Sequence, residues 1–398
     1  MLTIENVYKA SRVLKEVARR TDVIAAPQLC PDAEIYLKTE NLQITGSFKV
    51  RGAYYKMTQL SSEEKARGVI ACSAGNHAQG VALAATKNGI KAVICLPEGA
   101  PISKVEATKS YGAEVCLVEG VYDDAYQKAL QLQEEKGYTF IHPFDDEDVI
   151  AGQGTIALEL MEQIPDVDAI IVPIGGGGLI AGIAYTAKML NPNIKIYGVQ
   201  AQGAPSMKNA VEKGDTNGLP SVSTIADGIA VKKPGSLTYA LCKQYVDEIV
   251  TVTDDEISAA ILALMEKHKL ITEGAGAVSV AAAMFGKIDL KEKKTVCVLS
   301  GGNVDVTILS RVINRGLVMS GRNCQFMIEL KDQPGQLRNV LRIIAELGGN
   351  VTSVVHERAN AGSEVNGCYV RIVLETRNFD HIAQIRQSLM DFGFHVIE

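Results

Sequence analysis

The chain has 398 residues, of which 47% are hydrophobic and 22% charged, a composition typical of globular proteins. It is too long to fold around a single hydrophobic core. Its net charge of −6, without a basic run, argues against nucleic acid as a partner. No apolar segment approaches the roughly 18 residues of a membrane span, and the charged N-terminus does not resemble a signal peptide. We therefore expect no membrane association and a cytoplasmic location.

Short apolar runs alternate with helical segments from about residue 68 to residue 119, a pattern typical of a parallel sheet covered by helices. A second series begins near Asp168 and includes a helix from about Leu179 to Leu190. The pattern predicts an α/β fold with two doubly wound lobes. The small lobe, about 46–145, is expected to be inserted in a large lobe formed by 1–45 and 146–318. Ligands of such folds bind at the carboxyl ends of strands, here in the cleft between the lobes.

After residue 318 we expect a linker over 319–323 and a separate domain over 324–398. Phe326, Ile328 and Leu330 alternate as in a strand, a turn follows at 332–335, and the next apolar residues recur at helical spacing. Two further strands, a helix near Phe379–Phe392 and a final short strand complete the pattern. The order βαββαβ predicts a small α+β domain of ferredoxin-like type.

The eight cysteines are scattered along the chain without a C-x-x-C pair, and several lie in apolar runs. They are Cys30, Cys72, Cys95, Cys116, Cys242, Cys297, Cys324 and Cys368. We interpret them as reduced core residues. Neither disulfides nor a metal site are expected.

Lys49 is the first candidate for chemistry, in the segment Thr45–Gly52 at the entrance of a helix. The apolar residues Val50, Tyr54 and Met57 repeat there at helical spacing. The positive end of the helix dipole disfavours an ammonium group, so the amine is easier to deprotonate, as a lysine that forms a Schiff base must be. An isolated lysine is usually a solvated surface residue, and only its neighbours make Lys49 a candidate.

The segment Ser73–His77 lies between a predicted strand and the helix that follows. Its backbone N–H groups are expected to point into the cleft, where they suit a carboxylate. The alternative is a plain strand-to-helix turn, capped by Ser73 or Asn76.

The segment Gly175–Leu179 follows a strand and opens a helix, so its backbone can wrap a phosphate with N–H groups. A dinucleotide fold is the rival, because Gly176, Gly178 and Ala181 fit the spacing G-x-G-x-x-G/A. That fold requires an acidic residue after the next strand, where this chain has Gln200. The pattern therefore favours a phosphate group over NAD.

Ser300 lies in the segment Leu299–Asn303 after another predicted strand. Its hydroxyl could face the pyridine nitrogen of a cofactor, although a helix N-cap is an equally common role for such a serine. A neutral partner leaves the ring less electron-withdrawing than a carboxylate would, which suits β-elimination.

These four segments, in this order, closely resemble those of the fold type II pyridoxal-phosphate enzymes, and among them the threonine dehydratases, also called threonine ammonia-lyases. The resemblance extends from about Ile4 to Gly316. It implies pyridoxal 5'-phosphate as the cofactor, bound covalently by Lys49, with Phe48 against the ring. Its other contacts would be Asn76 to the ring hydroxyl, Gly175, Gly176, Gly177, Gly178 and Leu179 to the phosphate, and Ser300 to the ring nitrogen. The substrate carboxylate would be bound by Ser73, Gly75, Asn76 and His77.

The resemblance implies elimination of water and ammonia from L-threonine, giving 2-oxobutanoate, in a homodimer or homotetramer. L-serine, which lacks one methyl group, is expected to react more weakly and give pyruvate. The related serine racemases have a second serine where this chain has Ala74, so racemase activity is disfavoured. They also have a metal-binding glutamate where this chain has Ser223, so a monovalent ion, or none, is expected in place of a divalent one. The alternatives are a β-replacement enzyme such as O-acetylserine sulfhydrylase, threonine synthase, or a sensor without catalytic activity.

The C-terminal segment resembles an ACT domain through Asp332–Leu337 and its order of elements. The likeness implies pairing with the same domain of another subunit and an amino-acid effector such as isoleucine or valine. A domain that only stabilises the oligomer is the alternative. Entry into isoleucine biosynthesis and a catabolic role both remain open.

Overall fold

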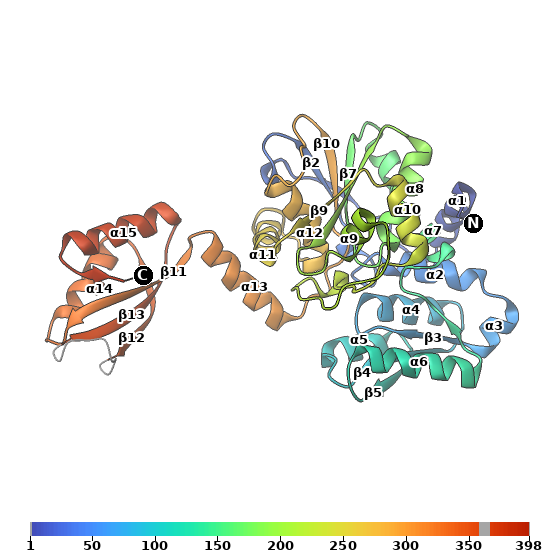
Figure 1. The fold of residues 1–398 in the computed structure, drawn as a ribbon, viewed down its shortest axis with the longest axis horizontal. Helices are drawn as coiled ribbons and strands as arrows, with labels where there is room; N and C mark the ends of the chain where they lie inside the picture. The colour runs from blue at the N-terminus through green and yellow to red at the C-terminus, as the bar shows by residue number, and fades with distance from the viewer. Residues whose placement is uncertain (1, 358–366, 398) are drawn as a thin grey trace. The chain divides into compact units, whose positions relative to one another are not determined.

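The computed structural model describes residues 2–357 and 367–397, and the chain divides into two compact units, Met1–Val306 and Thr307–Glu398 (Figure 1). The division falls near the start of helix α13 (Val306–Met319), whereas the sequence pattern predicts it after residue 318. Val312 and Gly316 are the buried residues of this helix. With so few buried positions, its sequence does not show to which unit the helix belongs. None of the described helices is long and apolar enough to cross a membrane.

The larger sheet of the first unit has the strand order β1-β2-β10-β7-β8-β9. Its strands are β1 (Val23–Ala25), β2 (Glu34–Lys38), β7 (Ala169–Pro173), β8 (Lys195–Ala201), β9 (Glu248–Val252) and β10 (Lys294–Val298). Strand β1 pairs antiparallel with β2, and the other pairings are parallel. All of β7 is buried, which explains its continuous apolar sequence.

The smaller sheet of the first unit has the order β5-β4-β3-β6, and all its pairings are parallel. Its strands are β3 (Val69–Cys72), β4 (Ala92–Pro97), β5 (Glu114–Val118) and β6 (Thr139–Phe140). The prediction of a parallel sheet in each lobe is therefore confirmed, and the structure adds the antiparallel strand β1 at the edge of the larger sheet.

Helices cover both sheets of the first unit (Figure 1). They are α1 (Ile4–Leu14), α2 (Lys49–Gln59), α3 (Ser62–Arg67), α4 (Asn76–Lys87), α5 (Ile102–Ser110), α6 (Tyr122–Lys136), α7 (Glu147–Gln163), α8 (Gly178–Leu190), α9 (Ser206–Lys213), α10 (Ser236–Tyr245), α11 (Asp254–Ala263) and α12 (Gly274–Met284). Residues 274–283 of α12 are all buried, as expected for a helix that is apolar on every side.

A buried network of charges fixes helix α2. The Arg51 guanidinium donates to both carboxylate oxygens of Glu40, at 2.9 and 2.8 Å, and to those of Glu159 on α7, at 2.6 and 3.0 Å. Lys38 at the end of β2 also donates to Glu159, at 2.6 Å. Burial acts to raise the pKa of Glu40, but the adjacent Arg51 charge leaves it below the usual value. The charges are therefore paired, as their burial requires.

The second unit contains the expected order βαββαβ after helix α13. The elements are β11 (Asn323–Lys331), α14 (Gln336–Glu346), β12 (Asn350–Glu357), β13 (Gly367–Glu375), α15 (Phe379–Asp391) and β14 (His395–Val396). The strands form an antiparallel sheet in the order β12-β13-β11-β14. Alternate residues of β11 and β13 are buried in one core with residues of α14 and α15.

Candidate active site

Lys49 is the first residue of α2, and the segment before it is attached to the chain that follows β10. Ser47 forms a β-bridge with Gly301. The N–H of Phe48 donates to the carbonyl of Ser300 at 3.2 Å. Lys49 and Ser300, which are far apart in the sequence, therefore lie in the same region of the fold.

The Lys49 amine donates to the carbonyl of Pro143 at 2.8 Å and lies 5.3 Å from the centroid of the Phe48 ring. Desolvation by the surrounding protein lowers the pKa of Lys49 to about 8, although the nearby Glu273 carboxyl acts in the opposite direction. An amine with this pKa is more readily deprotonated at neutral pH than an ordinary lysine. Lys49 can therefore act as a nucleophile or as a base.

Hydrogen bonds orient the side-chain amide of Asn76, the first residue of α4. Its Nδ2 donates to Glu273 Oε1 at 2.7 Å, and its Oδ1 accepts from Asn303 Nδ2 at 2.8 Å. Asn303 Nδ2 also donates to the carbonyl of Thr45 at 2.7 Å. An amide nitrogen carries two hydrogens, so one N–H of Asn76 remains to donate to a ligand in a fixed direction.

Glu273 was not identified by the sequence analysis. It is 5% exposed, and its pKa is raised to about 8 by burial and by the charge of Asp227, while the hydrogen bond from Asn76 acts in the opposite direction. The carboxyl group therefore retains its proton over much of the neutral range. Glu273 directly precedes helix α12, where an acidic residue is common, so its sequence position gives no sign of this environment.

The segment Gly175–Leu179 connects β7 to α8 and is tightly packed. Gly177 has a φ of +99°, which favours glycine. A Cβ on Gly176 would lie 2.3 Å from the ring of Phe144, and one on Gly178 would lie 2.9 Å from the Phe144 backbone. The first N–H groups of α8 have no acceptor within the helix. The segment can therefore present these donors to an anion at a helix N-terminus.

Ser300 is 2% exposed, and its hydroxyl donates to the carbonyl of Ala275 at 3.3 Å. This is a long hydrogen bond for a hydroxyl donor. The hydroxyl can therefore exchange this acceptor for a better one, and it remains neutral at any physiological pH.

The turn Ser73–His77 has a hydrogen bond within the turn itself. Ser73 Oγ accepts from the N–H of Gly75 at 3.2 Å, whereas the N-cap residue of α4 is Gly75, where no side-chain cap hydrogen bond is formed. The space beside Gly75 is open, because no heavy atom lies within 4 Å of a Cβ built there. His77 Nε2 lies 2.8 Å from the carbonyl of Ile141, and burial, together with the Lys49 charge, lowers the pKa of His77 to about 3. The ring is therefore neutral and its N–H is engaged, so His77 can donate to a ligand only through its backbone N–H.

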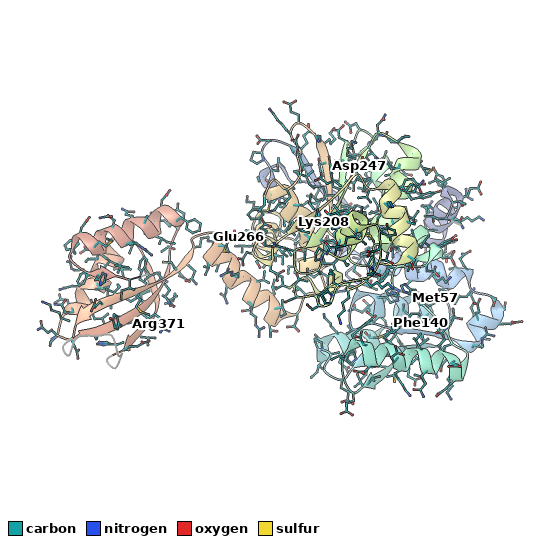
Figure 2. The ribbon with its side chains drawn as sticks, viewed as in Figure 1. Met57, Phe140, Lys208, Asp247, Glu266 and Arg371 are labelled. Carbon is teal, nitrogen blue, oxygen red and sulfur yellow. The ribbon has the colours of Figure 1, made fainter. Side chains whose placement is uncertain are left out.

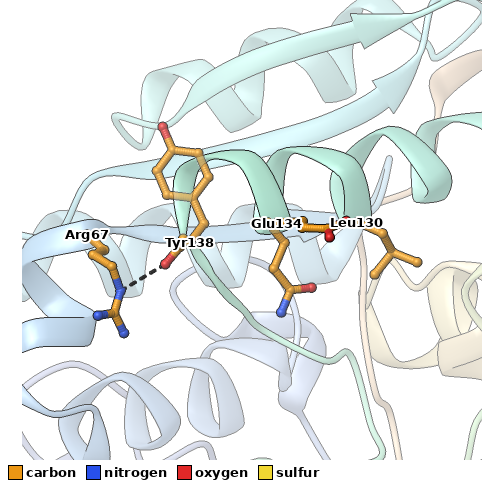
Figure 3. A pocket seen from close by; sticks show the side chains of 6 residues that line it. Arg67, Leu130, Glu134 and Tyr138 are labelled. Atoms are coloured by element: carbon orange, nitrogen blue, oxygen red, sulfur yellow. Dashed lines mark hydrogen bonds between the residues drawn. The ribbon is translucent and has the colours of Figure 1, made fainter.

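The small lobe also has a surface pocket that is lined by other residues (Figure 3). It is lined by Arg67, Leu130, Gln133, Glu134, Gly137 and Tyr138, from the ends of α3 and α6. Arg67 Nε donates to the carbonyl of Gly137 at 3.0 Å. None of the predicted site residues lines this pocket, so it is not the candidate active site.

The donors near Lys49 fit pyridoxal phosphate. The cofactor requires an amine that can lose its proton, donors for a phosphate and neutral partners around the ring. Lys49, the segment Gly175–Leu179, Asn76 and Ser300 have these properties. At Gly301 a Cβ would lie 2.5 Å from Glu273 Oε1 and 3.1 Å from Asn76 Nδ2, so a side chain there would crowd the oriented amide.

Residues 14–301 match the model of the pyridoxal-phosphate dependent enzyme family. The L-threonine ammonia-lyase of Thermotoga maritima is 49% identical over 398 residues, 100% of this chain and 99% of that protein. The catabolic L-threonine dehydratase TdcB of Escherichia coli is 49% identical over 281 residues, 70% of this chain and 85% of that protein. The structure of the processed threonine deaminase isoform 2 from Solanum lycopersicum has a TM-score of 0.74 and 40% identity, over 78% of this chain and 93% of that one. This chain therefore belongs to the family of pyridoxal-phosphate dependent enzymes.

Proposed function

We propose that the protein is an L-threonine ammonia-lyase, which converts L-threonine to 2-oxobutanoate and ammonia and acts more weakly on L-serine. The observation that carries this proposal is the likeness to the Thermotoga maritima enzyme over the whole chain. The partly desolvated amine of Lys49, beside the oriented amide of Asn76, supports it at the level of the site.

Pyridoxal phosphate, when bound, supplies an electron sink for the bond that breaks at the substrate Cα. Lys49 is assigned the proton transfer at this carbon, because its lowered pKa allows the amine to act as a base near neutral pH. The backbone N–H groups of Gly175–Leu179 are assigned to the phosphate. Asn76 would donate its remaining N–H to the ring oxygen, and Ser300 would place its hydroxyl at the ring nitrogen.

The turn Ser73–His77 is assigned to the substrate carboxylate. The open space beside Gly75 and the N–H groups at the start of α4 support this assignment. His77 would contribute its backbone, since its ring is bonded to Ile141. Ala74 in this turn has no hydroxyl to move a proton on the second face of the Cα, which favours elimination over racemisation.

We assign regulation to the second unit, as an ACT-like domain that binds isoleucine or valine and pairs with a second copy in a homodimer or homotetramer. The order βαββαβ and the turn at Gly335, with a φ of +93°, support the assignment. Entry into isoleucine biosynthesis would follow from inhibition by isoleucine. Titration of the enzyme with each amino acid tests this part, and an absence of both heat and kinetic effect would contradict it.

The catalytic proposal is tested by comparing the wild type with Lys49→Ala. Keto-acid release from L-threonine and the visible absorbance of the lysine-bound cofactor should both fall to the detection limit in the variant. Lys56→Ala is the matched control on the same helix, because Lys56 forms partly exposed ion pairs with Asp146 and Asp148 at 2.8 and 3.0 Å. Such pairs contribute about 1 kcal/mol or less, so activity should be retained. A wild type that binds the cofactor but leaves threonine unchanged would refute the proposed substrate.

A further inference from the structure

The buried face of the sheet in the second unit ends in three polar side chains. Cys368 pairs with Leu330, so it continues this face on β13 and is buried. His356 pairs with Val370 and therefore has its side chain on the same side of the sheet. Asp332 lies two residues after Leu330, so the alternation of side chains along a strand places it on the same side of the sheet. The rest of this face is apolar and includes Phe326, Ile328, Leu330, Val370, Ile372 and Leu374.

The residues of β13 that lie between the buried ones belong to the opposite, polar face of the sheet. Arg371, labelled in Figure 2, donates to Glu357 Oε1 at 2.8 Å on that face. An ion pair at this position is ordinary for an exposed sheet surface. A thiol, an imidazole and a carboxylate gathered at the end of an apolar face are not, and this arrangement suggests a ligand.

We propose that Asp332, His356 and Cys368 bind a zinc ion. Their ligand atoms lie within 4.8 Å of one another. In a tetrahedral zinc site, with bonds of about 2.0–2.3 Å, ligand atoms are roughly 3.3–3.6 Å apart. Asp332 and His356 are exposed, so their side chains can move by this difference without disturbing the core. The fourth position is left to water.

The chemistry of the three ligands selects the metal. Cys368 supplies a soft thiolate and His356 an imidazole, both of which favour zinc over magnesium or calcium. The Cys368 thiol donates to the carbonyl of Leu330 at 3.5 Å, a weak bond that is lost when zinc displaces the proton. Zinc binding therefore releases a proton and should weaken as the pH falls.

This site could not be predicted from the sequence because its ligands come from different elements. Asp332 follows β11, His356 lies one residue before the end of β12, and Cys368 is the second residue of β13. They have none of the short spacings typical of zinc motifs. Only the pairing of the three strands brings them together, which is why no metal was expected from the scattered cysteines.

The test uses the full-length, cofactor-loaded protein, stripped of metal and titrated with Zn²⁺ against a chromophoric chelator. We expect one ion per chain, and at least about 100-fold weaker binding in both Cys368→Ser and His356→Gln, since even second-layer substitutions at metal sites cost about 10–100-fold. Co²⁺ should produce a thiolate-to-cobalt absorption band in the difference spectrum between the wild type and Cys368→Ser, recorded at equal cofactor loading.

Two variants provide the controls. Cys324→Ser removes another cysteine of the same sheet, and His395→Ala removes an exposed histidine that pairs with Glu329 at 2.9 Å. Both should bind zinc like the wild type. His356→Gln alters only an exposed side chain, so it gives an answer even if Cys368→Ser fails to fold. Absence of zinc binding, equal binding by the ligand variants, or absence of the cobalt band would each overturn the proposal.

Discussion

Lys49 and Glu273 influence each other's ionisation, and desolvation moves their pKa values toward each other. The pKa of Lys49 falls to about 8 and that of Glu273 rises to about 8. Both groups therefore favour their neutral forms more strongly than they would in water. A neutral acid and a neutral amine in one site can accept and return protons near physiological pH.

Glu273→Gln should change how stability depends on pH in the cofactor-free protein. The ordinary pKa of the carboxyl is 4.5, and in the folded protein it is about 8. Between these values the unfolded chain releases the proton and the folded chain keeps it, so the wild type should lose stability as the pH rises from 4.5 to 8. The variant lacks this ionisable group and should lose less stability over the same pH range. Urea unfolding at pH 5 and pH 8 measures the difference.

The same substitution has a structural control. Glutamine keeps an oxygen that can accept the hydrogen bond from Asn76, whereas Glu273→Ala leaves that donor without its acceptor. We expect cofactor affinity to fall clearly in Glu273→Ala and little in Glu273→Gln. If stability depends equally on pH in the wild type and in Glu273→Gln, the Glu273 carboxyl is already ionised in the folded wild type at pH 5.

At the scale of single residues, the sequence pointed to the segments around Lys49, Asn76 and Ser300, and the structure brings them into one region. It did not reveal Glu273 or Asn303, because their importance lies in contacts with Asn76 made from distant parts of the chain. It also could not distinguish the ring of His77 from its backbone. Motifs identify positions, whereas hydrogen-bond partners depend on the fold.

At the scale of elements, the segment between β6 and α7 links the segment Gly175–Leu179, which we assign to the phosphate, to Lys49. Pro143 accepts from Lys49, and its neighbour Phe144 packs against Gly176 and Gly178. The strands of this region were predictable from their apolar runs. This connecting segment was not, because it has no regular secondary structure and no motif.

Gly178→Ala should weaken cofactor binding through this connection. The added Cβ would lie 2.9 Å from backbone atoms of Phe144, which cannot move alone, and such overpacking costs about 1–3 kcal/mol. A roughly tenfold rise in the dissociation constant of pyridoxal phosphate is expected, measured by reconstitution of the cofactor-free protein. Gly99→Ala is the control, since no heavy atom lies within 4 Å of its Cβ position. Unchanged affinity in Gly178→Ala would show that the loop relaxes freely.

At the scale of the whole molecule, the chain contains two compact units with separate cores. Calorimetry should therefore resolve two unfolding transitions. Pyridoxal phosphate should raise the midpoint of one transition only, because a ligand stabilises the unit that binds it. Lys49→Ala should show a smaller shift under the same conditions. A single transition that moves as a whole would show that the units unfold together.

Arg51 anchors α2 two residues after Lys49, yet the network of Arg51, Glu40, Glu159 and Lys38 does not include the Lys49 amine. The side chain assigned to the chemistry is thus separate from those that hold its helix. During evolution, a duplicated gene could lose Lys49 while the encoded protein kept its shape. Loss of Lys49 would therefore remove the proposed chemistry while leaving the contacts that hold α2 in place.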